Sequence, residues 1–191
     1  IMQPVVQLAD TGMRADNMVQ LEKLNNTIAG MTASTCGSPI LYNAIVSDSF
    51  FKQVTEFLPG LNCLGDVLKA RRYKMAMVSG WDLGFAGHGA LFTDRGADQA
   101  YGPDFVMKSA PGKRTDFGAY DGNVLQVASK ILDELHAGTQ PFGLTIPTSG
   151  GHFPDGVLDP SCDDHVDLPK HEPVILHAVW CTNFLVKQFL D

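Results

Sequence analysis

The sequence predicts an α/β fold with parallel strands, and two helix–strand units carry this prediction. Residues 61–72 have the spacing of an amphipathic helix and run directly into an apolar strand over 73–79. Residues 121–136 form the most regular helical pattern of the chain, and the apolar segment 142–146 follows it. A helix that leads into a strand after a short connection is typical of folds in which helices cover a parallel sheet.

The elements nearest the start of the chain are shorter. Residues 5–9 are predicted to form a short buried strand, and residues 16–24 have apolar side chains three positions apart, as one face of a helix has. Asn25 or Asn26 would cap a further helix that begins near Thr27, because a side-chain oxygen at that position accepts from the first free N–H groups.

The later elements alternate between clear helices and long connections. In 121–136, apolar residues recur at the spacing of a helix that packs one face on a core. Residues 81–111 are rich in glycine and aromatic residues without periodicity, which predicts loops with short elements. A loop is expected over 147–173, and a buried final helix over 174–190.

Length, charge and hydropathy limit the classes of function. The 191 residues predict one domain, and 45% of them are hydrophobic, as a packed core requires. The net charge of −7 argues against nucleic acid and anionic membranes as partners. A phosphate-bearing substrate remains compatible, because a bound cation can invert the local field. We expect no membrane span, and a chain trimmed at both ends, its membrane anchor not included.

The four cysteines, Cys36, Cys63, Cys162 and Cys181, are compatible with two states. They are either reduced thiols of a cytosolic protein or two disulfides of an exported one. Because the chain contains no Cys-x-x-Cys pair, a zinc ribbon is not expected. Spacing alone does not choose between the two states.

An uncharged segment of small and hydroxyl-bearing residues, 27–39, is the first candidate site. Such a composition lets the backbone approach a phosphate or a metal closely. Thr27 would lie at a helix N-terminus, where free N–H groups favour an alkoxide and phosphate oxygens. Thr32, Ser34 and Thr35 offer equally available hydroxyls, so the residues alone do not single out Thr27.

An acid and a histidine are the next candidates. Asp10 follows the first predicted strand, where open α/β sheets bind ligands, and could hold a metal ion or merely cap a turn. His152 lies on a glycine-rich loop after the strand that ends at Ile146. It could bind an anion or protonate a leaving group, or be a surface histidine. The run Asp163–His165 is expected to be a solvated loop.

Four segments, in this order, resemble the periplasmic phosphoglycerol transferases that substitute osmoregulated glucans. These enzymes belong to the sulfatase and alkaline phosphatase superfamily and are related to lipoteichoic acid synthases and phosphoethanolamine transferases. The resemblance extends from Thr27 to Asp191. It is carried by the nucleophile region (27–39), the helix after it (62–69), the substrate loop (80–87) and the histidine loop (151–156).

The resemblance implies a three-layer α/β/α sandwich of the alkaline phosphatase/sulfatase type, with its C-terminal part missing. Residues 1–191 would be one partial catalytic domain. Thr27 would be the covalent phosphoryl acceptor and, with Asp10, a metal ligand, while His152 would contact the transferred phosphate. Trp81 and His88 would bind substrate.

The same resemblance implies a cofactor, partners and a compartment. The cofactor would be a divalent metal, Zn²⁺, Mn²⁺ or Mg²⁺. The donor would derive from a phospholipid, and the acceptor would be a glucan or a lipid. The location would be periplasmic or membrane-associated and extracytoplasmic. Disulfides Cys36–Cys63 and Cys162–Cys181 would tie the nucleophile helix to the next helix and the histidine loop to the last.

Two departures from the family keep alternatives open. Only residues 11–26 separate Asp10 from Thr27, and the chain ends before the family's later Asp-His metal pair, which Asp164–His165 cannot replace. We expect metal-dependent transfer of phosphoglycerol or phosphoethanolamine through phosphothreonine, if the metal site is completed. The alternatives are a phosphodiesterase or other hydrolase of this superfamily and an inactive fragment acting as a binding module. The sulfatase motif Cys-x-Pro-Ser-Arg is absent, which disfavours sulfate chemistry.

Overall fold

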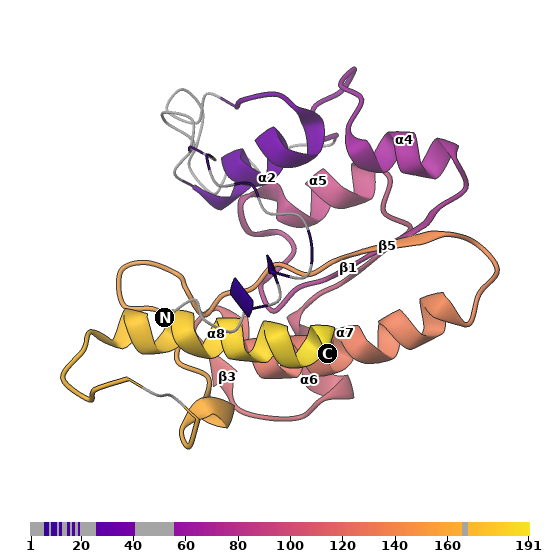
Figure 1. The fold of residues 1–191 in the computed structure, drawn as a ribbon. Coiled ribbons are helices and arrows are strands. Elements are labelled where there is room, and N and C mark those ends of the chain that lie inside the picture. Colours follow the sequence, from indigo (N-terminus) through magenta and orange to yellow (C-terminus); the bar gives the residue numbers. More distant parts are fainter. Residues whose placement is uncertain are drawn as a thin grey trace.

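A three-stranded parallel sheet lies between two groups of helices (Figure 1). The computed structural model describes residues 26–40, 56–165 and 168–191, and before them Val6, Gln7, Ala9, Asp10, Gly12, Ala15, Asn17 and Val19. The strand order is β2–β1–β5, with β1 at Lys74–Val78, β2 at Gln99–Tyr101 and β5 at Phe142–Thr145. Both pairings of β1 are parallel, as the sequence predicts.

Helices lie on both sides of the sheet in Figure 1, which confirms the layered α/β fold. One side holds α2 (Thr27–Cys36), α4 (Leu64–Ala70) and α5 (His88–Asp94), the last preceded by the short 3₁₀ helix η2 (Phe85–Gly87). The other side holds α6 (Pro103–Ser109), α7 (Asp121–His136) and α8 (Val174–Leu190). A further 3₁₀ turn, η3 (Pro160–Cys162), precedes α8.

The core between the sheet and α7 explains why this helix is so regular in sequence. Val124, Val127 and Ile131 of α7 are buried in one cluster with Ala76 and Val78 of β1. Each buried aliphatic side chain of this size contributes roughly 1.5–3 kcal/mol. The predicted bounds of α7 and α8 agree with the structure, whereas α4 is shorter than the predicted helix over 61–72.

The predicted strand over 5–9 is wrong at the residues that are described. Val6, Gln7 and Ala9 are helical, and the Asp10 N–H donates to the Val6 carbonyl at 3.1 Å. Short apolar runs fit a strand and a buried helical turn equally well, so periodicity could not distinguish them. The helix predicted over 16–24 lies mostly outside the described residues.

A small antiparallel hairpin, β3 (Arg114–Thr115) and β4 (Gly118–Ala119), is attached to the end of β1. The Ala119 N–H donates to the Gly80 carbonyl at 2.9 Å. Gly118 has a φ of +128°, and a Cβ there would lie 2.1 Å from the Gly80 carbonyl oxygen. Only glycine allows this approach, so the hairpin is fixed beside the carboxyl end of β1.

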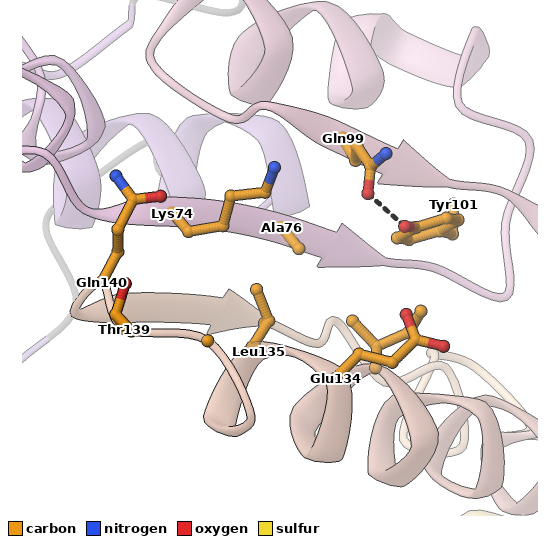
Figure 2. Close-up of a pocket in the computed structure, with 10 residues that line it drawn as sticks. Lys74, Ala76, Gln99, Tyr101, Glu134, Leu135, Thr139 and Gln140 are labelled. Carbon is orange, nitrogen blue, oxygen red and sulfur yellow. Dashed lines mark hydrogen bonds between the residues drawn. The ribbon is translucent and has the colours of Figure 1, made fainter.

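A hollow of about 330 Å³ lies between the sheet and the end of α7 (Figure 2). Its lining includes Lys74, Gln99, Tyr101 and Glu134, and the Tyr101 hydroxyl donates to the Gln99 side chain. Burial, and then the nearby Glu134 carboxylate, raise the pKa of Tyr101 above its ordinary value of 10.0. The hollow lies by the amino ends of β1 and β5, whereas α/β sheets bind ligands at their carboxyl ends.

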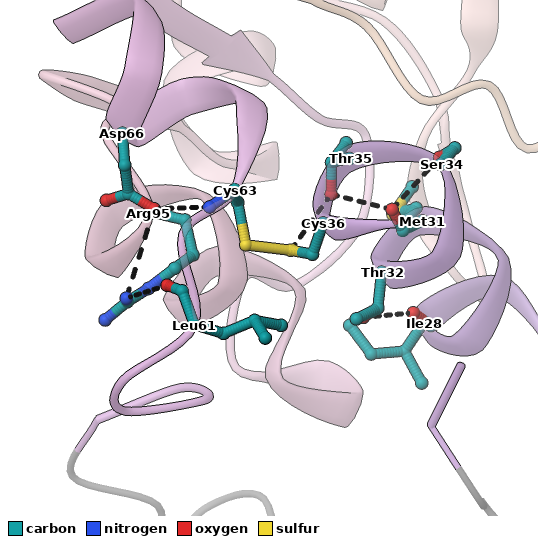
Figure 3. Close-up of a disulfide and its surroundings, with 10 residues drawn as sticks. All are labelled: Ile28, Met31, Thr32, Ser34, Thr35, Cys36, Leu61, Cys63, Asp66 and Arg95. Carbon is teal, nitrogen blue, oxygen red and sulfur yellow. Dashed lines mark hydrogen bonds and ion pairs between the residues drawn. A yellow bond between two sulfur atoms is a disulfide. The ribbon is translucent and has the colours of Figure 1, made fainter. Parts of the chain in front are cut away.

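The structure contains both disulfides that the resemblance implies, Cys36–Cys63 and Cys162–Cys181. The first joins the end of α2 to the residue that caps α4 (Figure 3). There the Asp66 carboxylate accepts from the Cys63 N–H at 2.9 Å, and Arg95 donates to the Leu61 carbonyl at 2.9 Å. The second joins η3 to α8.

Candidate active site

A cleft of about 360 Å³ opens at the carboxyl end of the sheet. It brings together Thr27 at the start of α2, Trp81 after β1, and His152 in the loop after β5. Thr182 and Asn183 of α8 complete one wall. Three residues that the sequence and its resemblance proposed therefore line one cavity, although they are far apart in the chain.

Thr27 is the first residue of α2 and is exposed. Asn26 is the N-cap, with extended φ and ψ of −118° and 157°, and its side chain accepts from the Ala29 N–H at 2.9 Å. This confirms one of the two caps that the sequence offered. The remaining free N–H groups of the first turn carry partial positive charge, which favours an anion beside the Thr27 hydroxyl.

The other three hydroxyls of α2 are engaged by their own helix. Thr32 donates to the Ile28 carbonyl at 2.8 Å, and Ser34 and Thr35 donate to the Met31 carbonyl at 3.0 and 2.7 Å. Thr32 is also fully buried. Among the described residues no hydrogen bond holds the Thr27 hydroxyl, which distinguishes Thr27 from the other three candidates.

His152 is exposed on a loop that closes on itself. The His152 N–H donates to the Ser149 carbonyl at 3.0 Å, and its own carbonyl accepts from Gly156 at 2.8 Å. Val157 then donates to the Gly150 carbonyl at 2.8 Å. These backbone hydrogen bonds fix the loop at the carboxyl end of β5 and present the imidazole to the cleft.

A buried carboxylate that the sequence analysis did not single out anchors this loop. Asp121, the first residue of α7, is 3% exposed. Its Oδ1 accepts from the Ser149 N–H at 2.7 Å and the Ser149 hydroxyl at 3.1 Å. Its Oδ2 accepts from the Gly150 N–H at 2.8 Å and the Thr182 hydroxyl at 3.1 Å. Asp121 thus joins α7, the histidine loop and α8 from beneath the cleft.

The two substrate contacts implied by the resemblance differ in position. Trp81 lines the cleft, and its indole Nε1 is buried without a hydrogen-bond partner among the described residues. His88 does not line the cleft; it is 2% exposed, and its Nδ1 lies 2.5 Å from the Phe85 carbonyl. Burial lowers the pKa of His88 below its ordinary value of 6.5, although the hydrogen bond to Phe85 opposes this.

The described residues do not provide a metal site. They contain no group of three or more His, Cys, Asp or Glu side chains that could hold a cation. No carboxylate is among the described residues that line the Thr27 cleft, and exposed Asp10 is not part of that lining. His165 instead stacks on Phe184, with ring centroids 5.0 Å apart, and Asp163 and Asp164 are exposed, as a solvated loop requires.

The layered α/β fold with a cleft at the carboxyl end of its sheet agrees with the sulfatase and alkaline phosphatase superfamily, to which the family comparison assigns the chain. The chain belongs to the Sulfatase family, whose model it matches over residues 7–190.

Curated relatives narrow this class. Phosphoglycerol transferase I of Citrobacter koseri is 33% identical over 187 residues, and that of Escherichia coli O127:H6 is 37% identical over 188 residues. Both alignments cover 96% of this chain but 24% of the relative. The chain therefore spans about a quarter of the length of these transferases.

Two solved structures share the fold. The lipoteichoic acid synthase LtaP of Listeria monocytogenes superposes with a TM-score of 0.79 and 17% identity, covering 99% of this chain and 45% of that one. An alkaline phosphatase superfamily protein of Vibrio parahaemolyticus gives a TM-score of 0.61 and 21% identity, covering 85% and 37%. At these identities the similarity shows the fold alone.

No helix in the described part of the chain combines the length and the apolar character that a membrane span needs.

Proposed function

We propose that residues 1–191 are the nucleophile-bearing part of a catalytic domain that transfers a phosphoglycerol group, with phosphoethanolamine as the other head group to test. Phosphoglycerol transferase I relatives that match 96% of the chain support the class of reaction. The observation that carries the proposal is the position of Thr27, which lines the same cleft as His152, while the other hydroxyls of α2 donate to helix carbonyls.

In the first step, Thr27 Oγ attacks the phosphorus of a phospholipid head group. The Oγ–P bond forms, the bond from phosphorus to the diacylglycerol oxygen breaks, and the threonine proton is lost to solvent. His152 donates a proton to the leaving oxygen and regains a proton from solvent. The N-terminal N–H groups of α2 stabilise the negative charge on the phosphoryl oxygens.

The divalent cation implied by the resemblance would need more ligands than the described residues of the cleft provide. The requirement for Zn²⁺, Mn²⁺ or Mg²⁺ stays a prediction, with Thr27 and Asp10 as proposed ligands. Metal titration followed by calorimetry tests it. The two disulfides support an extracytoplasmic location, periplasmic or membrane-associated, because such bonds persist in oxidising compartments.

The test is whether Thr27 becomes covalently modified. The chain is incubated with phosphatidylglycerol or phosphatidylethanolamine, with each divalent metal in turn, and its peptides are weighed by mass spectrometry. We expect a phosphoglycerol adduct on the peptide that contains Thr27. Thr27→Ala should abolish the adduct, whereas Thr35→Ala should retain it, because the Thr35 hydroxyl donates to Met31. An adduct that survives Thr27→Ala would overturn the proposal.

A non-catalytic binding module is the second candidate. The lack of a metal-ligand group among the described residues favours it. Such a module would bind a phospholipid head group or a glucan without forming the adduct. A superfamily phosphodiesterase would form the adduct and release it to water, so product analysis with and without a glucan separates transfer from hydrolysis.

A further inference from the structure

The orientation of the His152 imidazole depends on few contacts. The backbone hydrogen bonds of residues 149–157 fix the course of the loop, but they leave the two side-chain torsions of His152 free. The residue is exposed, and among the described residues no hydrogen bond or ion pair holds its imidazole. Its ring contact is with Phe117, at 4.5 Å between centroids and an interplanar angle of 43°. Phe117 is therefore the side chain best placed to decide which way the imidazole points.

The Phe117 ring belongs to an element that is firmly attached to the core. Phe117 lies in the turn between β3 and β4, and its N–H donates to the Thr115 hydroxyl at 3.0 Å. Ala119, two residues further on, is fully buried in the core cluster beneath α7. The Ala119 N–H also donates to the Gly80 carbonyl at 2.9 Å. The hairpin therefore keeps Phe117 in place without help from the histidine loop.

The same hairpin contacts a second residue of the cleft. Gly118, the residue after Phe117, pairs with Trp81 in an antiparallel bridge. Trp81 and His152 both line the Thr27 cleft. The backbone of the hairpin is thus fixed at one wall of the cleft, while the Phe117 ring lies against the histidine of another. A ring held in this way can fix the imidazole relative to the cleft.

Phe117 contacts the histidine from outside the cleft. It lines a neighbouring groove of about 490 Å³ and does not line the Thr27 cleft, whereas His152 lines both. A substrate in the cleft would meet His152 and not Phe117. Phe117 is also 40% exposed and is not a member of the core cluster beneath α7. Its position suits a residue that orients the histidine better than one that binds substrate or stabilises the fold.

The orientation matters because His152 is proposed to donate a proton to one particular oxygen. A proton donor has to lie within hydrogen-bond reach of that oxygen, about 2.6–3.2 Å. An imidazole without a preferred contact distributes over roughly three staggered χ1 positions and two ring positions, so about one orientation in six is productive. A contact between two aromatic rings favours its own arrangement by a factor of about three to ten. Both estimates predict that losing the ring slows proton donation by less than about tenfold.

We propose that Phe117 is a positioning residue, whose ring holds the His152 imidazole in the orientation that serves the Thr27 cleft. Its effect on the reaction rests on the proposed function, in which His152 donates a proton to the leaving oxygen. Phe117 takes no part in making or breaking bonds. The orientation of the imidazole can be measured without any reaction, so the two parts of the inference have separate tests.

Three variants separate the orientation of the imidazole from the fold. Phe117→Leu removes the ring but keeps an apolar side chain, and Phe117→Tyr keeps the ring. Phe105→Leu is the matched control, because Phe105 is also 40% exposed and lies 4.5 Å from a ring, that of Tyr101, outside the cleft. NMR three-bond couplings report χ1 of His152, and His152→Gln assigns its signals. We expect one rotamer in the wild type, Phe117→Tyr and Phe105→Leu, and averaging over several rotamers in Phe117→Leu.

The rate of adduct formation at Thr27 is measured on the same variants as a function of phosphatidylglycerol concentration. At saturating lipid the rate should fall about three- to tenfold in Phe117→Leu, while the half-saturating lipid concentration stays unchanged. Phe117→Tyr and Phe105→Leu should keep the wild-type rate. On a His152→Gln background, Phe117→Leu should have no further effect, because a positioning residue acts only through the histidine.

The results that contradict the inference differ from those that contradict the proposed function. A single His152 rotamer that persists in Phe117→Leu overturns the inference. Averaged rotamers with an unchanged rate overturn the role of Phe117 in the reaction and leave the proposed function intact. An equal fall in rate on the His152→Gln background shows that Phe117 acts directly, which also overturns the inference. Absence of any adduct in the wild type overturns the proposed function, while the couplings still show whether Phe117 holds the imidazole.

Discussion

The Asp121 carboxylate should be the most sensitive polar group of the site, and Asp121→Asn tests this. The substitution keeps the size of the side chain but replaces one carboxylate oxygen with an NH₂ group. All four partners of Asp121, two on each oxygen, are donors. Whichever way the amide turns, one backbone N–H (of Ser149 or Gly150) then faces another donor, while the hydroxyl on the same side can rotate to accept from the NH₂ group. The remaining hydrogen bonds lose the contribution of the charge.

The magnitude follows from these contacts. Hydrogen bonds to a charged group contribute about 1.5–3 kcal/mol each and neutral ones about 0.5–1.5 kcal/mol, so losing one and reducing the others to neutral strength predicts a decrease in unfolding free energy of about 3–6 kcal/mol. A domain is typically stable by about 5–15 kcal/mol, so the variant should be folded but much weaker. Thr182→Val removes only one of the four donors and should cost about 1 kcal/mol.

Urea unfolding of the wild type, both single variants and the double variant measures these differences. Because Thr182 and Asp121 share a hydrogen bond, the double variant should lose less than the sum of the single losses. Hydrogen exchange gives a local readout: the amides of Ser149 and Gly150 should exchange faster in Asp121→Asn, while those of β1 should not. A loss no larger than that of Thr182→Val, with both amides still protected, would refute the role of Asp121 as the anchor of the loop.

Three further predictions concern the frame around the cleft. Replacing Cys36 and Cys63 by Ala should lower the unfolding free energy by about 3.5 kcal/mol, and replacing Cys162 and Cys181 by Ala should lower it by about 3.2 kcal/mol, because the disulfides close separations of 27 and 19 residues. The urea midpoints of both variants measure this loss, and midpoints equal to that of the wild type would contradict it. Because burial lowers the pKa of His88 below 6.5, the unfolded chain binds more protons than the folded chain around that pH, so stability should be fully present above pH 6.5 and should fall as the pH drops through it. His88→Gln should flatten this dependence, and an unchanged slope would exclude His88 as its source. Asn26→Ala removes the cap of α2 and should cost about 1 kcal/mol in thermal or urea unfolding, whereas Ser34→Ala should cost less.

Local patterns predicted the helices and central strands because their side chains report burial directly. The repeat in 121–136 mirrors the face of α7 that packs on β1, and apolar residues 73–79 mirror a strand covered on both faces. The strand β2 could not be predicted, because Gln99–Tyr101 is short and only its parallel pairing with β1 makes it a strand. The strand predicted over residues 5–9 was wrong because a short apolar run fits a helical turn as well as a strand.

The site was predictable where chemistry is visible in a residue type, and not where it depends on packing. Thr27 and His152 stand out as a hydroxyl at a helix start and a histidine among glycines, and both line the cleft. His88 looked like a substrate contact by its place in a motif, but α5 buries it with its Nδ1 against the Phe85 carbonyl. Asp121 reads in the sequence as the acidic first residue of a helix, and only the fold brings Ser149, Gly150 and Thr182 to it.

The two residues of the proposed reaction, Thr27 and His152, are held in position by different kinds of contact. The proposed nucleophile depends on the first turn of α2, which Asn26 caps, Ile28 packs into a hydrophobic cluster with Leu91, and the Cys36–Cys63 disulfide ties at the other end of the helix. His152 depends on contacts among α7, the loop after β5 and α8, which converge on Asp121. Weakening Asp121 should therefore change the acid–base steps at His152 while the Thr27 turn persists. We therefore expect adduct formation at Thr27 to be slower in Asp121→Asn, while the Ala29 amide, which Asn26 caps, stays protected from hydrogen exchange.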